Sequence, residues 1–122
     1  MQEYISRNID KELIAWKDDS MRKPLLLRGA RQVGKSSAVR HFGREFKYFA
    51  EVNFERHKAI KTFFQGDIDV HMIAQKISNY IKVPMVAGET LLFFDEIQEC
   101  PEAIMALRFF KEDYPELHVI AA

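Results

Sequence analysis

Pro24-Leu-Leu-Leu-Arg-Gly-Ala-Arg-Gln-Val-Gly-Lys-Ser36 is the stretch that decides the fold of this 122-residue chain. It opens with a short apolar run closed by Gly29, which is typical of a buried strand. From about Lys35 to Phe46 the apolar residues recur at helical spacing, so a helix with one buried face is predicted there. The stretch is therefore a strand, a glycine-rich turn and a helix in direct succession.

The turn itself, residues 29–36, matches the pattern G-x-x-x-x-G-K-[ST] in full. Two glycines permit backbone angles that a Cβ would forbid, so successive N–H groups can turn inward around phosphate oxygens. Lys35 is predicted to reach the β- and γ-phosphates of a nucleotide, and the Ser36 hydroxyl to ligate Mg²⁺. The predicted nucleotide-binding residues are Gly29, Ala30, Arg31, Gln32, Val33, Gly34, Lys35, Ser36 and, through a hydroxyl near the α-phosphate, Ser37. The alternative is a glycine-rich turn with an incidental lysine.

A second motif, Leu91-Leu-Phe-Phe-Asp95-Glu96, is an apolar strand that ends in two adjacent carboxylates. In a parallel sheet, ligands gather at the carboxyl ends of the strands, where the phosphate loop also lies. Asp95 is predicted to hold Mg²⁺ through water, and Glu96 to orient and deprotonate the water that attacks the γ-phosphate. The alternative is a solvated acidic turn.

The residues around this pair also separate classes of nucleotide-binding protein. GTPases place Asp-x-x-Gly at this point, whereas this chain has Asp95-Glu-Ile-Gln98. Their guanine-reading Asn-Lys-x-Asp is absent as well. The sequence therefore favours ATP hydrolysis.

The whole chain alternates apolar strands with amphipathic helices. Strands are predicted at 23–28, 48–53, 90–94 and 117–122, and helical segments at about 8–19, 35–46, 55–65, 68–82 and 101–114. Continuous apolar strands separated by helices belong in a parallel sheet covered on both faces. We therefore predict an α/β, P-loop NTPase-like fold, incomplete, with about four strands.

Composition excludes several classes of protein. A hydrophobic fraction of 48% and a charged fraction of 30% are typical of a globular domain, not of a disordered or fibrous chain. The single cysteine rules out an internal disulfide, and the four histidines are too scattered for a zinc site. No apolar run reaches about 18 residues and the first residues contain no apolar signal core, so a cytoplasmic location without membrane contact is expected.

Charge is distributed unevenly although the net charge is zero. Residues 1–61 carry 14 Lys and Arg against 8 Asp and Glu, whereas residues 62–122 carry 4 against 10. The excess in the first half predicts an anionic ligand there. Arg40, Arg44 and Lys47 support nucleic-acid association as a weaker third hypothesis, since no recognition motif is present. The alternative for these residues is a solvated helix face.

The loop Gly29-x-Arg-Gln-Val-Gly-Lys-Ser36, the segment LLFFDEIQECPEA and the ending ELHVIAA resemble the prokaryotic AAA-superfamily ATPases with a GxRQVGK loop. The opening Tyr4-Ile5-x-Arg7 is also similar to theirs, so the resemblance covers the whole chain. It implies ATP and Mg²⁺ as cofactors, ATP or ADP as ligands, and self-association through the ATPase domain. Members of the family are described largely as ATP-binding proteins of unknown cellular role.

The resemblance also implies roles for single residues. It assigns phosphate and Mg²⁺ to Lys35 and Ser36, Mg²⁺ to Asp95 and the catalytic base to Glu96. Asn53 lies where such proteins often keep a polar residue that hydrogen-bonds the catalytic glutamate, and a strand-end cap is the equal alternative. Tyr4 and Ile5 fall near the adenine pocket, although plain core packing is the stronger interpretation.

The resemblance further implies that residues 1–122 form the N-terminal part of one AAA-type ATPase domain, ending before the γ-phosphate sensor, the fifth strand and the lid. We therefore expect nucleotide binding with slow turnover. The alternative function is a non-hydrolysing nucleotide-binding switch or interaction module.

Overall fold

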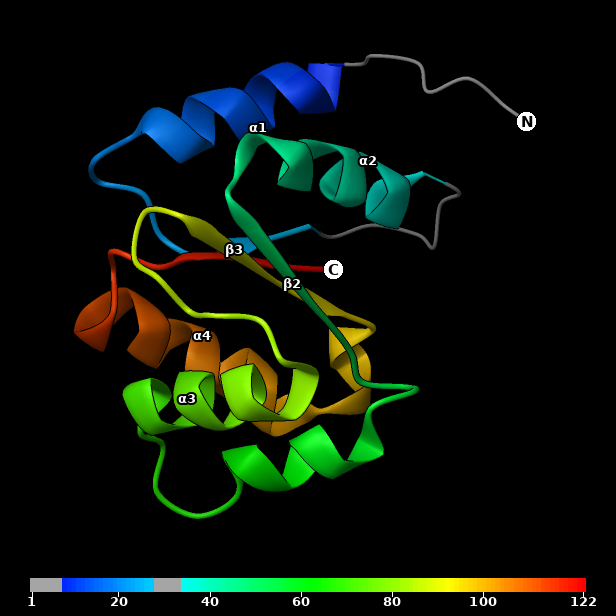
Figure 1. The fold of residues 1–122 in the computed structure, drawn as a ribbon, viewed down its shortest axis with the longest axis vertical. Coiled ribbons are helices and arrows are strands. Elements are labelled where there is room, and N and C mark those ends of the chain that lie inside the picture. The colour runs from blue at the N-terminus through cyan, green and yellow to red at the C-terminus, as the bar shows by residue number, and fades with distance from the viewer. Residues whose placement is uncertain (1–7, 28–33) are drawn as a thin grey trace.

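The computed structural model describes residues 8–27 and 34–122 (Figure 1). The α-helices are α1 (Asn8–Asp18), α2 (Lys35–Phe42), α3 (Val70–Ile81) and α4 (Pro101–Asp113). The 3₁₀ helices are η1 (Gly43–Glu45), η2 (Lys58–Phe64) and η3 (Ile97–Glu99). The strands are β1 (Leu25–Leu26), β2 (Tyr48–Asn53), β3 (Thr90–Asp95) and β4 (His118–Ala121).

The four strands form one parallel sheet in the order β1-β4-β3-β2. The pairing of β2 with β3 runs from Tyr48 opposite Thr90 to Asn53 opposite Asp95. Strand β4 lies between β1 and β3, so the strand that precedes the phosphate loop is not adjacent to the acidic strand. The predicted α/β class with an incomplete, P-loop NTPase-like parallel sheet is confirmed.

Helices cover both faces of the sheet. Figure 1 shows α1 and α2 on one side and α3, α4 and η2 on the other. Side chains alternate along β3, so Leu91 and Phe93 pack in the cluster with α1 and α2, whereas Leu92 and Phe94 pack in the cluster with α3 and α4. All six residues of β3 are buried, as expected for a strand inside a covered parallel sheet.

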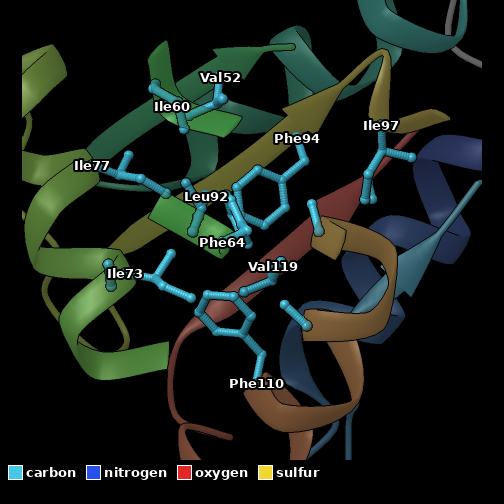
Figure 2. Close-up of a cluster of buried hydrophobic side chains, with 14 of the residues drawn as sticks. Val52, Ile60, Phe64, Ile73, Ile77, Leu92, Phe94, Ile97, Phe110 and Val119 are labelled. Atoms are coloured by element: carbon cyan, nitrogen blue, oxygen red, sulfur yellow. The ribbon is translucent and has the colours of Figure 1, made fainter. Parts of the chain in front are cut away.

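Phe94 lies in the larger of these two clusters (Figure 2). Its ring centroid is 5.5 Å from that of Phe54, 5.8 Å from that of Phe64 and 6.1 Å from that of Phe110. These contacts join β3 to the turn after β2, to η2 and to α4. Aromatic packing at Phe94 therefore fixes the end of β3, where Asp95 is the last residue.

Two predicted helices differ from the observed ones. The helix predicted to reach Phe46 ends at Phe42 and continues as η1. A Cβ on Gly43 would lie 2.6 Å from Cδ1 of Phe49, so the chain passes against the Phe49 ring at a position where only glycine fits. The segment predicted as a helix at 55–65 is the 3₁₀ helix η2, which begins at Lys58.

His118, at the start of β4, is buried under α1. Its Nε2 lies 3.1 Å from the carbonyl oxygen of Lys17, and its Nδ1 lies 3.3 Å from Nη2 of Arg22. Since a carbonyl only accepts, Nε2 carries the proton, and Nδ1 accepts from the guanidinium. The ring also meets Trp16 and Phe46 edge-on, with centroids 5.4 and 5.0 Å apart. These contacts suit the neutral imidazole.

We predict that acidification destabilises the chain through this histidine. Burial lowers the pKa of His118 below its ordinary value of 6.5, and the charges of Arg22 and Lys17 lower it further, against the opposing effects of the Lys17 carbonyl and Asp18. The unfolded chain therefore binds the proton more tightly than the folded chain. The contribution of His118 to the free energy of unfolding is therefore fully present above pH 6.5. It is lost as the pH falls from 6.5 through the pKa that His118 has in the folded chain.

His118→Gln supplies the control, because a glutamine can donate to Lys17 and accept from Arg22 without titrating. Urea unfolding at pH 7.5, 6.5 and 5.5 should show a smaller loss of unfolding free energy in the variant than in the wild type. Equal losses would show that other groups cause the acid sensitivity.

Candidate functional site

The two motifs found in the sequence meet at the carboxyl edge of the sheet. The Ser36 hydroxyl, in the first turn of α2, donates a hydrogen bond of 3.1 Å to Oδ1 of Asp95, the last residue of β3. The two residues are 59 positions apart in the chain. The predicted proximity of the phosphate loop and the acidic strand end is therefore present in the structure.

Gly34 sets the start of α2. Its φ of 115° and ψ of −16° lie in the left-handed region that glycine adopts without strain, as predicted for this position. Among the described residues, no side chain caps this end of α2 and its first turn contains no acidic residue. The N–H groups of the first turn therefore offer donors and a positive dipole end to an anion.

The other predicted phosphate-loop residues divide into two groups. Lys35 and Ser36 are half-buried at the start of α2, and Ser37 is exposed. Gly29, Ala30, Arg31, Gln32 and Val33 lie outside the described residues, as do Tyr4 and Ile5. Their roles stay predictions.

Glu96 follows Asp95 in an unusual backbone conformation. Its φ of 54° and ψ of 46° are left-handed, which costs a non-glycine residue about 1–2 kcal/mol. The Glu96 N–H donates to Oδ1 of Asp95 at 2.9 Å, and Nε2 of Gln98 donates to Oε1 of Glu96 at 2.8 Å. The backbone of the half-buried Glu96 is thus tied to Asp95, and its carboxylate to Gln98, a partner that the sequence analysis did not identify.

Asn53 lies opposite Asp95 in the register of β2 and β3. Its Oδ1 accepts from the N–H groups of Glu55 and Arg56 at 2.9 and 3.2 Å, and its own N–H donates to Nδ1 of His57 at 3.0 Å. The strand-end cap, one of the two interpretations of Asn53, is therefore confirmed. A catalytic role of Asn53 towards Glu96 would use its amide nitrogen and stays a prediction.

Arg40 contacts two carboxylates at the carboxyl edge of the sheet, whereas its place on the outer face of the helix suggested a solvated side chain. Its Nε and Nη2 donate to the two carboxylate oxygens of Glu51, both at 2.9 Å, and Nη2 lies 3.5 Å from Oδ2 of Asp95. The pKa of Arg40 is raised, chiefly by the hydrogen bond with Glu51. Glu51 and Asp95 both contact Arg40 because their side chains lie on the face of the sheet that α2 covers. Side chains along a strand alternate between the two faces.

The basic residues Arg40, Arg44 and Lys47 are accordingly less available to an anionic partner than the sequence suggested. Arg40 pairs with Glu51, and Nζ of Lys47 lies 3.5 Å from Oε1 of Glu89. Of the three residues behind the nucleic-acid hypothesis, two thus have an acidic partner, and Arg44 is exposed. Local charge pairing accounts for much of this basic surface.

The oxygens of Ser36 and Asp95 are of the type that Mg²⁺ prefers. Within the described ranges, no group of three or more His, Cys, Asp or Glu side chains is arranged to hold a metal ion. A hydroxyl and one carboxylate nevertheless fit Mg²⁺, because this ion usually takes one or two protein oxygens together with substrate phosphates and water.

No helix in residues 8–27 and 34–122 has the length and apolar character needed to cross a membrane. A comparison with curated proteins gave no match. A family model described as an AAA domain matches residues 21–122, which is most of the chain. The chain therefore belongs to the AAA-domain family and is a P-loop ATPase-like nucleotide-binding domain.

Proposed function

We propose that this domain binds Mg²⁺-ATP and hydrolyses it. Lys35 and the N–H groups at the start of α2 hold the phosphates, Ser36 and Asp95 hold Mg²⁺, and Glu96 activates the attacking water. The observation that carries the proposal is the 3.1 Å hydrogen bond between Ser36 and Asp95, because it joins the two motifs at one edge of the sheet. The family match supports nucleotide binding.

The orientation of Ser36 suits a metal ligand. Its proton is directed to Oδ1 of Asp95, so the lone pairs of Oγ remain for a cation. Asp95 is 8% exposed and also accepts from the Glu96 N–H, which limits its rotation. When bound, Mg²⁺ would neutralise charge on the phosphoryl oxygens.

The place of Glu96 in the chain, directly after Asp95, supports its role as general base. Gln98 holds one carboxylate oxygen at 2.8 Å, and the left-handed turn keeps the side chain next to the strand end. A carboxylate in this place is positioned to accept a proton from a water near the γ-phosphate. The strained conformation at Glu96 is consistent with selection of this residue for its position.

Replacement of Lys35 should remove most of the nucleotide affinity. Lys35→Ala takes away the one side-chain cation in the first turn of α2, and we expect ATP affinity measured by titration calorimetry to fall at least about tenfold, as for loss of a charged hydrogen bond. Lys11→Ala is the matched control, since Lys11 is an exposed lysine on α1. Equal ATP affinity in the wild type and in Lys35→Ala would refute the assignment of the loop.

Replacement of Glu96 should separate hydrolysis from binding. Glu96→Gln keeps the shape of the side chain but cannot accept a proton, so we expect at least about a hundredfold slower phosphate release with nearly unchanged ATP affinity. Single-turnover assays with the protein in excess over labelled ATP detect slow rates.

Glu99→Gln is the control for this experiment, since Glu99 is the next carboxylate along the chain and is exposed. If Glu99→Gln loses the rate and Glu96→Gln keeps it, the base is Glu99. If the wild type binds ATP without releasing phosphate, the non-hydrolysing switch becomes the better description.

A further inference from the structure

Three charged side chains lie in a row beside the proposed metal site, with Arg40 of α2 between Glu51 of β2 and Asp95 of β3. Arg40 lies between two carboxylates, with Nη2 2.9 Å from Oε2 of Glu51 and 3.5 Å from Oδ2 of Asp95. The side chain of Arg40 is 47% exposed, that of Glu51 26% and that of Asp95 11%. We refer to these three residues as the Arg40 triad.

The distances show which carboxylate holds the guanidinium. Glu51 accepts two short hydrogen bonds from Nε and Nη2 of Arg40. This is the bidentate geometry in which arginine binds a carboxylate most strongly. Asp95 receives only the longer contact at 3.5 Å. Its short hydrogen bonds come instead from Ser36 and from the Glu96 N–H, both to Oδ1.

The charges of the triad matter because a cation close to Asp95 competes with Mg²⁺. Arg40 and Asp95 together are neutral, so an arginine paired with Asp95 alone would cancel the charge that attracts the metal. Glu51 restores a net charge of −1 to the triad. Because Asp95 is the least exposed of the three, solvent screens its interactions least.

We propose that Glu51 is a positioning residue that holds Arg40 off Asp95 and so sets the affinity of the site for a divalent cation. This inference rests on the proposed function, since it takes Asp95 to be a ligand of Mg²⁺. Arg40 stays 3.5 Å from Oδ2 of Asp95, and Glu51 prevents Arg40 and Asp95 from forming a closer ion pair.

A purely structural role makes a different prediction. If the pair only joined α2 to β2, loss of either partner would lower stability and leave the metal requirement unchanged. The net charge of the triad is instead 0 in Glu51→Gln, −1 in the wild type and in the double variant Arg40→Gln/Glu51→Gln, and −2 in Arg40→Gln. The metal requirement should follow this order of charge.

The experiment measures how much Mg²⁺ is needed to reach half of the metal-dependent gain in ADP affinity, using a fluorescent ADP analogue. We expect Glu51→Gln to need about fivefold more Mg²⁺ than the wild type, on the scale of one partly screened charge near the site. The double variant should need the same Mg²⁺ concentration as the wild type within about twofold, and Arg40→Gln should need less. Arg108→Gln is a matched control, because Arg108 pairs with Glu112 on the exposed side of α4.

Recovery in the double variant is the decisive result, because a second destabilising change cannot restore a site that was merely damaged. If the double variant needs as much Mg²⁺ as Glu51→Gln, or if the four proteins need equal amounts, the inference is wrong. If Glu51→Gln does not fold, the comparison of Arg40→Gln with the wild type decides: an unchanged or higher Mg²⁺ requirement overturns the proposal.

ADP binding in the presence of EDTA separates this inference from the proposed function. A wild type that binds no nucleotide with or without Mg²⁺ would overturn both. A wild type that binds Mg²⁺-ADP, with variants that do not differ in their metal requirement, would overturn only the role of Glu51.

Discussion

The parallel pairing of β3 with its two neighbours is the constraint on which the site depends. Parallel pairing places the carboxyl ends of β2, β3 and β4 at one edge, and the alternation of side chains sends Leu91, Phe93 and Asp95 to the side of α2. A shift of β3 by one residue would turn Asp95 away from Ser36 and bury it among the aromatic rings of the other face. The apolar residues of β3 therefore fix the position of its one carboxylate.

Much of this arrangement could be predicted from sequence, because it follows from short-range patterns. A glycine-rich turn between a strand and a helix, and an apolar strand that ends in Asp95, each carry their own signal. The rule that ligands collect at the carboxyl edge then brings Ser36 and Asp95 together. The order of the strands could not be predicted in the same way, since apolar strands of similar composition do not specify their neighbours.

The features that the sequence did not predict depend on contacts between distant residues. Helix α2 ends at Phe42 and continues as η1, where Gly43 lies against the Phe49 ring, and no local pattern records that approach. The contacts of Arg40 with Glu51 and Asp95 could not be predicted, because helical periodicity does not show which strand lies beneath a helix. Glu51 carries a usable signal, as the one charged residue of the strand YFAEVN, but its partner could be found only in three dimensions.

Asp95 also lies between the two residues that we propose as metal ligand and base, Ser36 and Glu96. A carboxylate buried to this degree needs partners, and it draws them from the start of α2, from the middle of α2 and from the turn at Glu96. The same oxygen, Oδ1, accepts from both the Ser36 hydroxyl and the Glu96 N–H. The Ser36 hydroxyl and the left-handed turn at Glu96 thus share one acceptor. This one oxygen therefore joins the first turn of α2 to the turn that follows β3.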